Sequence, residues 1–414
     1  MHTAQHLEPR PYLLHNRIQP YEWGGRGPGA FIPRLLGIEP EPGRPYAELW
    51  IGAHPSAPSQ VELGGRLVPL PDAIARQPDD LLGPAVVARF GASLPFLLKV
   101  LSAARPLSIQ VHPNGAQAEC LHARDPEHYP DPNHKPEIAI ALDGLSALAG
   151  LKPFAGIVEA LERTPELAEL AGPALARELV AGAGASPAEQ QALVRRLFGA
   201  LVACATAHEA ALAAALERLE QRLRSQARPL ASDEALFLDL RAEYPDPDIG
   251  LLAIFLLNQV HLQAGQGLYI AAGVPHAYLG GNIVECMAAS DNVVRAGLTP
   301  KFKDAAALAE ILTYELGPLP ILAGAPGARE VAYPTPAAEF QVTRWELEGG
   351  DELAGATAGR LQVLLVTEGA LRLAWPGGGG MAVQRGQAVL VPACLEEYSV
   401  AAASRAQVFR VTVP

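Results

Sequence analysis

The sequence is poor in cysteine, and its cysteines are far apart. The chain has four of them, at Cys120, Cys204, Cys286 and Cys394. No two form a CxxC motif, which excludes a zinc ribbon and a dithiol redox motif. Scattered cysteines are typical of free thiols in a reducing compartment, so we expect no disulfide framework.

Long apolar runs are also absent. No uncharged apolar stretch reaches the roughly 18 residues that a membrane-spanning helix needs. The run LLAIFLLN, residues 251–258, is too short for a span and predicts a buried helix. The opening MHTAQHLEPRPYLL lacks the basic start and the apolar run of a signal peptide, so we expect a cytoplasmic protein.

Positive charge is scarce, and lysine is scarcer still. The net charge of -12 argues against a nucleic acid or an anionic membrane as a general partner. An anionic small substrate would need a local positive pocket. Because arginine is so favoured, a lysine beside other polar candidates is itself a candidate functional residue. The lysines are Lys99, Lys135, Lys152, Lys301 and Lys303.

The residue pattern changes along the chain, which at 414 residues is long enough for two or three domains. Short apolar runs between Pro and Gly predict β-strands in residues 1–153 and again in 259–320. Residues 154–258 carry Ala, Leu, Glu and Arg at helical spacing. Residues 321–414 open with a Pro- and Gly-rich linker and then alternate as strands, with no histidine to bind a metal.

Two helices are predicted from local signals. The stretch SPAEQQALVRRLFGALV can be capped by Ser186, and Glu189 would complete a capping box. The stretch AAALAEILTYEL, residues 305–316, predicts a helix after the second β segment. Because residues 154–258 hold no cluster of catalytic residue types, we expect a structural or interface role for this helical insertion.

Four residues are candidate metal ligands. Gln110 and His112 lie two apart in SIQVHP, and in a strand their side chains share one face. Glu137 opens the apolar run EIAIAL, and His276 follows a turn that contains Gly and Pro. Two nitrogens and two oxygens suit zinc, although an amide ligand is unusual. The simpler explanation of SIQVHP is a polar strand face in contact with water, and both stay open.

Candidate catalytic residues gather in VECMAASDNVVRAGLTPKFKD. Glu285 stands in an otherwise apolar run, where it is either exposed or held in a cleft with a shifted pKa. Arg295 suits bidentate contact with a phosphate or carboxylate, and Lys301 and Lys303 supply point charges. The alternative is a solvated loop.

These candidates fall within six longer motifs. The motifs are YEWGG (21–25), AELWIGAHPSAPS (47–59), LPFLLKVLSAARPLSIQVHPN (94–114), DPNHKPEIAIAL (131–142), GVPHAYLGGNIVECMA (273–288) and SDNVVRAGLTPKFKD (290–304). Together, and in this order, they resemble the type I phosphomannose isomerase family, which interconverts mannose 6-phosphate and fructose 6-phosphate. One departure is Gly25, where the family often has Ser.

The resemblance implies a site and its chemistry. It implies one zinc ion per chain, held by Gln110, His112, Glu137 and His276, and a catalytic role for Arg295. It also implies that seven further residues line or border the pocket: Lys135, Glu285, Trp23, Glu48, Lys99, Ser108 and Lys301.

Roles for these residues are hypotheses. Glu285 is the preferred proton-transfer group, with Lys135 as the alternative. Arg295 would stabilise charge during the reaction, and Lys301 with Ser108 would bind the phosphate.

The implied fold is mainly β with a helical insertion. A cupin-type β-sandwich or barrel would form the catalytic domain from residues 1–153 and 259–320. An α-helical domain would span 154–258, and a second cupin-like β domain would span 321–414. The expected partner is a small sugar phosphate, with neither nucleic acid nor membrane.

Two other functions fit parts of the pattern. A cupin dioxygenase would bind iron through His112, His276 and Glu137, with Gln110 as a bystander. A sugar-binding cupin without catalysis would need no proton-transfer residue.

Overall fold

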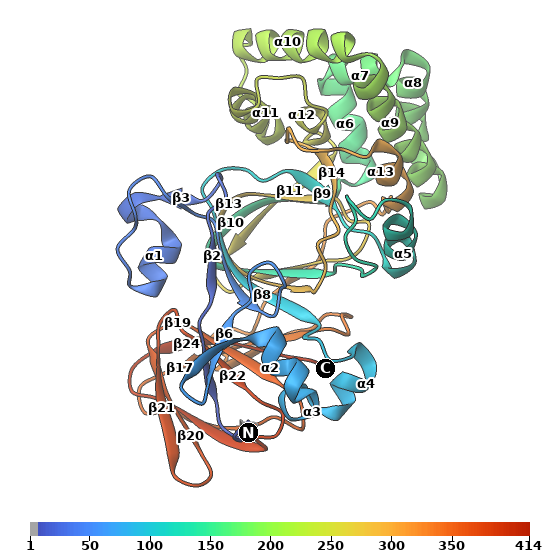
Figure 1. Cartoon of the computed structure of the whole chain (residues 1–414). Coiled ribbons are helices and arrows are strands. Elements are labelled where there is room, and N and C mark those ends of the chain that lie inside the picture. The colour runs from blue at the N-terminus through green and yellow to red at the C-terminus, as the bar shows by residue number, and fades with distance from the viewer. Residues whose placement is uncertain (1–6) are drawn as a thin grey trace.

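A computed structural model describes residues 7–414 and arranges them in three regions along one axis (Figure 1). Helices form the region drawn at the top, a large sheet forms the middle, and a second β region in orange and red lies at the bottom. The protein is therefore rich in sheet with one helical region, as the sequence pattern predicts.

A ten-stranded antiparallel sheet forms the middle region. Its main path runs through β15 (Ile321–Leu322), β12 (Gly267–Ile270), β10 (Glu137–Leu151), β13 (His276–Ala288), β8 (Phe96–Ala103), β5 (Glu48–Gly52) and β2 (Arg17–Gln19). Beside this path, β11 (Leu257–Gln263) pairs with β10, and β9 (Ile109–Val111) pairs with β13 and β14 (Val294–Gly297). Because β10 pairs with β13 across the helical insertion, the segments before and after the insertion share one sheet.

The helical region leaves the sheet after β10 and returns at β11. Its helices are α6 (Phe154–Arg163), α7 (Pro165–Ala171), α8 (Pro173–Ala181), α9 (Pro187–Ala207), α10 (Glu209–Ser225), α11 (Ser232–Glu243) and α12 (Gly250–Ala253). Ser186 and Glu189 form the predicted capping box at the start of α9. The apolar faces of these helices share one core that also reaches β9 and β14.

No single helix in residues 7–414 has both the length and the apolar composition of a membrane span. The helices α9 and α10 meet that test only when joined, and they are bent by 110° relative to each other.

The C-terminal region consists of a six-stranded and a four-stranded sheet. The larger sheet contains β1 (Tyr12–Leu14), β22 (Ala388–Val391), β19 (Gln362–Glu368), β24 (Ala406–Thr412), β17 (Gln341–Leu347) and β16 (Glu330–Tyr333). The smaller contains β18 (Glu352–Ala356), β23 (Glu397–Ala402), β20 (Ala370–Trp375) and β21 (Gly379–Gln384). The N-terminal strand β1 thus belongs to a sheet built mainly from the other end of the chain.

Smaller elements surround the two β regions. They are the paired strands β3 (Gly25–Arg26) with β4 (Pro45–Tyr46) and β6 (Gln60–Leu63) with β7 (Arg66–Pro69), and the helices α1 (Phe31–Leu36), α2 (Leu70–Arg76), α3 (Pro78–Leu82), α4 (Pro84–Phe90), α5 (Gly115–Arg124) and α13 (Ala305–Ile311). All four cysteines are free, as predicted.

Two helix predictions are wrong in extent. The run at 251–258 is buried, but α12 ends at Ala253 and β11 begins at Leu257. The helix predicted over 305–316 ends at Ile311 because Leu312 turns to an extended conformation. The Thr313 N–H then donates to the Gly273 carbonyl, 3.0 Å away, instead of continuing the helix.

Candidate active site

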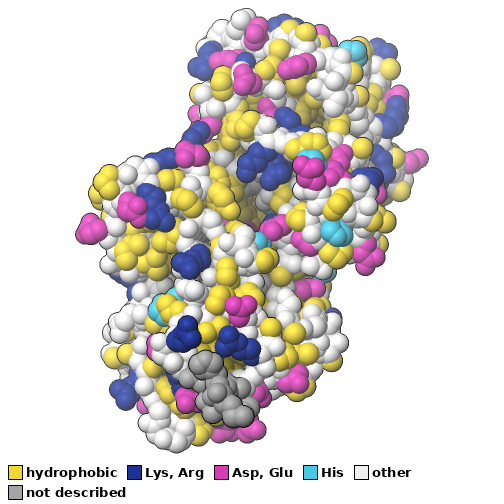
Figure 2. All heavy atoms as spheres, viewed as in Figure 1, with side chains coloured by type: hydrophobic (Ala, Val, Ile, Leu, Met, Phe, Trp, Pro, Cys, Tyr) yellow, Lys and Arg dark blue, Asp and Glu magenta, His cyan; other side chains and the backbone are white. Residues whose placement is uncertain are grey.

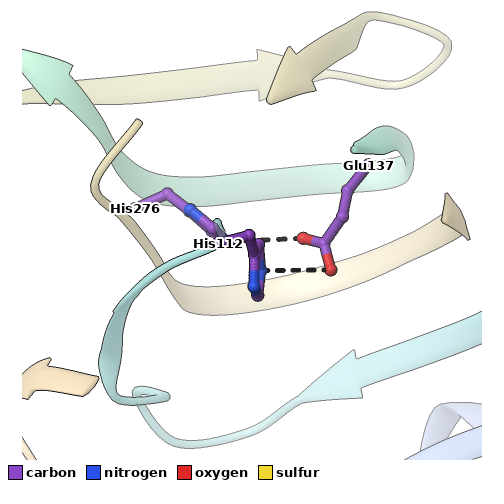
Figure 3. A group of neighbouring side chains, drawn as sticks. All are labelled: His112, Glu137 and His276. Atoms are coloured by element: carbon purple, nitrogen blue, oxygen red, sulfur yellow. Dashed lines mark ion pairs between the residues drawn. The ribbon is translucent and has the colours of Figure 1, made fainter. Parts of the chain in front are cut away.

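Three buried side chains converge in the middle region (Figure 3). His112 directly follows β9, Glu137 begins β10, and His276 begins β13. The Nε2 atoms of His112 and His276 lie 3.3 and 3.4 Å from the two carboxylate oxygens of Glu137. One donor atom from each residue lies within 4.8 Å of the others, a spacing that could hold a metal ion.

The two imidazoles are oriented with a lone pair toward this centre. His112 Nδ1 lies 2.8 Å from the Asn292 carbonyl oxygen, and His276 Nδ1 lies 3.0 Å from that of Val274. A carbonyl can only accept, so each Nδ1 carries the hydrogen and each Nε2 is free to bind a cation. Burial lowers the pKa of His112 to about 4, which keeps this ring neutral at ordinary pH.

Two atoms of the cluster lack hydrogen-bond partners. They are His112 Nε2 and Glu137 Oε2, and both are buried. Unpartnered buried polar atoms are costly, and a bound cation would satisfy both. The cluster therefore fits a divalent metal ion on the chemistry of its own atoms.

Gln110 is the fourth predicted ligand and lies at the same place. Its Nε2 is 3.2 Å from His276 Nε2. Rotation of the amide would put its oxygen in this position, since the two ends of the group are interchangeable in shape. Ile109 and Val111, on the opposite side of β9, are buried in the core shared with the helices. The structure thus brings all four predicted ligands together.

Lys135 lies next to this cluster. Its Nζ is 3.1 Å from Glu137 Oε1, and both side chains are buried. Burial alone would raise the pKa of Glu137, but Lys135 and His112 outweigh it and hold that pKa well below its ordinary value. Glu137 is therefore a carboxylate ready to bind a cation.

A second charged row crosses β5, β8 and β13. Lys99 Nζ lies 3.4 Å from Glu48 Oε2 and 3.6 Å from Glu285 Oε2, and the three side chains are buried. Burial opposes the charge on Lys99, but the two carboxylates raise its pKa above the ordinary value. Burial, and next the nearby Glu137, raise the pKa of Glu285, whose Oε1 accepts a 2.9 Å hydrogen bond from Tyr278.

These groups face one pocket of about 520 Å³. Its lining includes ten of the predicted site residues: Trp23, Glu48, Lys99, Ser108, Gln110, Lys135, Glu137, Glu285, Arg295 and Lys301. His112 and His276 are buried and are not part of this lining. Figure 2 shows a hollow between the helical region and the middle region, with Lys and Arg side chains on its rim.

Two cations in this lining are free to meet an anion. Within residues 7–414, the side chains of Arg295 and Lys301 have no ion-pair partner in the structure. Arg295 lies on β14 and is half-buried, and this burial lowers its pKa from the ordinary value. Lys303 differs, because its Nζ binds Asp248 at 3.0 Å and it does not line the pocket.

Comparison with known proteins places this arrangement in a family. Residues 12–154 match the model for the catalytic domain of type I phosphomannose isomerase. The chain is 38% identical over 394 residues to mannose-6-phosphate isomerase 2 of Arabidopsis thaliana, covering 92% of this chain and 88% of that protein.

The chain belongs to the type I phosphomannose isomerase family.

Solved structures agree with this membership. A variant of phosphomannose isomerase from Salmonella typhimurium is 31% identical, with a TM-score of 0.84 and coverage of 97% of this chain and 98% of that chain. A mannose 6-phosphate isomerase bound with zinc and yttrium matches with a TM-score of 0.83 and 31% identity, again covering 97% and 98% of the two chains. The similarity thus extends over the helical and C-terminal regions of this phosphomannose isomerase family member, beyond the matched catalytic segment.

Sequence reasoning misses several residues of the pocket. The helical insertion supplies Glu243 and Tyr244, which contact the loop before β9. Arg105 forms an ion pair with Glu243, and Tyr244 Oη donates to the Pro106 carbonyl at 3.2 Å. No local pattern marks these contacts, because the partners lie more than a hundred residues apart in the chain.

Sequence reasoning also misses Tyr278, although it lies two residues after His276. It is fully buried and donates to Glu285. Its alternation with His276 on β13 is the available signal, since residues two apart share a strand face.

Proposed function

We propose that the protein interconverts mannose 6-phosphate and fructose 6-phosphate by moving a proton between C2 and C1. The observation that carries the proposal is a single pocket in which the cation-binding cluster, a buried carboxyl with a raised pKa and two unpaired cations meet. Membership of the family supplies the substrate class.

We infer that the resident metal is one zinc ion per chain. Gln110, His112, Glu137 and His276 would hold it, and their nitrogen and oxygen donors suit zinc. When bound, zinc would polarise the carbonyl of the open-chain sugar and stabilise negative charge on its oxygen.

Glu285 is the proposed proton-transfer group. As a carboxylate it would take the proton from C2 of the aldose, leaving an enediolate. After the hydroxyl proton has moved from O2 to O1, Glu285 would return its proton to C1. A pKa raised by burial brings a carboxyl closer to the range in which both steps are efficient. Lys135 is the alternative, although its Nζ is bound to Glu137 at 3.1 Å.

The remaining residues bind and orient the substrate. Lys301 and Ser108 would bind the phosphate, and Arg295 would stabilise the enediolate charge. Trp23 and Glu48 would border the sugar, with Glu48 held by Lys99.

We also infer cupin-type architecture for both β regions. The catalytic domain would comprise residues 1–153 and 259–320, the helical domain 154–258, and the second β domain 321–414. Two antiparallel sheets facing each other across an apolar core in the C-terminal region support this division.

An assay of purified protein tests the proposal. We expect conversion of mannose 6-phosphate to fructose 6-phosphate, loss of activity after chelation, and recovery on adding zinc. Oxygen consumption with iron, and no isomerisation, would favour the dioxygenase. Sugar phosphate binding without turnover by folded, zinc-loaded protein would favour a binding protein.

A further inference from the structure

Asp248 is a buried carboxylate that the proposed chemistry does not use. It lies between α11 and α12 in the helical region. Its Oδ1 accepts hydrogen bonds from the N–H groups of Gly250 and Leu298, each at 2.7 Å. Its Oδ2 lies 3.5 Å from the Thr299 nitrogen and 3.0 Å from Lys303 Nζ. Asp248 therefore joins the helical region to the segment after β14.

The segment after β14 has an unfavourable backbone conformation where it contacts Asp248. Leu298 has φ of 54°, in the left-handed region that a residue with a Cβ rarely adopts. Such a conformation persists only where neighbouring groups hold it. The Leu298 N–H bond to Asp248 is one such constraint, and Leu298 itself is buried.

The two backbones also touch directly beside Asp248. A Cβ built on Gly297 would lie 2.4 Å from the Gly250 Cα, so no side chain fits there. The contact requires glycine on both sides, since a Cβ on Gly250 would lie 2.6 Å from the Leu298 nitrogen. The helical region and the end of β14 are therefore in close backbone contact at this point.

The two ends of the segment are held differently. Arg295 and Gly297 are paired with β9 through the sheet. Beyond Gly297, the backbone N–H groups bind side chains: Leu298 and Thr299 to Asp248, and Lys301 to Thr299 Oγ1 at 3.1 Å. The sheet thus fixes Arg295, and Asp248 fixes the backbone beyond Gly297.

The segment held by Asp248 is part of the pocket wall. Leu298, Thr299, Pro300 and Lys301 all line the pocket. Lys303 forms an ion pair with Asp248 and does not line the pocket. Lys301 is therefore the lysine of this segment that faces the pocket.

We propose that Asp248 is a positioning residue of the helical insertion, which fixes the segment from Leu298 to Lys301 in the conformation that binds the substrate phosphate. The inference rests on the proposed isomerase function. It gives the helical insertion a role in substrate affinity, beyond the structural role that its sequence predicts.

The test compares Asp248→Ala and Asp248→Asn with the wild type, all loaded with zinc. Asp246→Ala is the matched control, because Asp246 lies on the same connection but is exposed. We measure KM and kcat for mannose 6-phosphate, and the affinity for inorganic phosphate by calorimetry. Zinc content and the melting temperature are measured alongside.

For Asp248→Ala we expect KM and the phosphate dissociation constant to rise together by about 10-fold, as loss of a buried hydrogen-bond acceptor predicts. The kcat should stay within about threefold, because the sheet still fixes Arg295. Asp248→Asn keeps one acceptor oxygen but loses the charge that holds Lys303, so its phosphate affinity should fall by about threefold, less than in Asp248→Ala. Asp246→Ala should match the wild type.

A folded Asp248→Ala protein with wild-type KM and phosphate affinity would overturn the proposal, even if its melting temperature falls. If Asp248→Ala does not fold, Asp248→Asn decides: a phosphate affinity about threefold below that of the wild type supports the proposal, and an unchanged affinity overturns it. A wild type that binds phosphate but does not isomerise refutes the proposed function, while the calorimetry still tests Asp248.

Discussion

The two β regions of the molecule are both built from antiparallel strands but bury different residues. The middle region buries seven acidic, basic or histidine side chains at or near the pocket: Glu48, Lys99, His112, Lys135, Glu137, His276 and Glu285. The C-terminal region, from residue 321 onward, buries neutral polar side chains instead: Thr343, Thr357, Gln362 and Thr367. Both place antiparallel sheets around apolar residues, so sheet architecture alone does not make a site.

The buried amide of Gln362 is hydrogen-bonded at both ends, whereas two buried atoms of the metal-binding cluster lack such partners. In the C-terminal region, Gln362 accepts a 2.6 Å hydrogen bond from Tyr398 and donates to the Ala356 carbonyl at 2.7 Å. In the middle region, opposite charges satisfy one another only partly, and His112 Nε2 and Glu137 Oε2 lack hydrogen-bond partners. Burying a charge is costly, so a group retained in that state is a functional candidate.

The largest expected effect comes from removing the charge of Glu137. Glu137→Gln keeps the size of the side chain but leaves the Lys135 ammonium without its partner and weakens cation binding. We expect kcat to fall by about 10³-fold or more, together with zinc content measured by mass spectrometry. The control is Glu397→Gln, an exposed change in the C-terminal region. Full zinc content with wild-type kcat would show that Glu137 is not needed to bind the metal or for catalysis.

The next largest effect should come from Glu285→Gln. The variant cannot accept a proton from carbon, so we expect kcat to fall by about 10²- to 10⁴-fold while zinc content stays at the wild-type level. Loss of zinc instead would show that Glu285 acts through the metal cluster.

Glu285 should also set the acidic limb of the pH profile. Its pKa is raised above 4.5 by burial, so the carboxylate form that accepts the proton is lost at a higher pH than for an ordinary glutamate. Activity should rise with pH through that raised pKa, and Lys135→Met should move this limb to higher pH, because the Lys135 ammonium lowers the pKa of Glu285. The free energy of unfolding should instead fall as pH rises. The neutral carboxyl of Glu285 contributes its full stability below about pH 4.5, and this contribution is lost as pH rises through the folded-state pKa.

A change in the C-terminal core should affect stability and leave catalysis intact. Leu373 is fully buried between the two sheets of that region. Leu373→Ala should lower the free energy of unfolding by about 2–5 kcal/mol through lost burial and a cavity. Denaturant unfolding measures this effect, while KM, kcat and zinc content should match the wild type. A changed KM would mean that the two β regions are coupled more closely than their separate interiors suggest.

The smallest expected effect is at the start of α9. Ser186→Ala removes the side chain that caps this helix and should cost about 1 kcal/mol of stability. Thermal unfolding should detect the loss, with kinetic constants unchanged. Ser186→Asp, which can cap equally well, should restore stability and serves as the paired control.

The features predicted from sequence are those fixed by local geometry. Alternation along a strand predicts that Gln110 and His112 share a face, and the capping box at Ser186 is predicted from three-residue spacing. The roles of Asp248 and Tyr244 could not be predicted, since their partners lie in other regions and meet them only through the fold. The early end of α13 has the same cause, because the competing acceptor is the distant Gly273 carbonyl.

The pairing of β1 with β22 bears on how the protein is made. Tyr12–Leu14 is synthesised long before its partner Ala388–Leu390. At about 5–20 residues per second, the first strand waits on the order of tens of seconds for its neighbour. During that interval the side chains of Tyr12 and Leu14, buried in the folded protein, have no cover from β22. A chain cut short before residue 388 would keep that strand permanently unpaired and prone to aggregation.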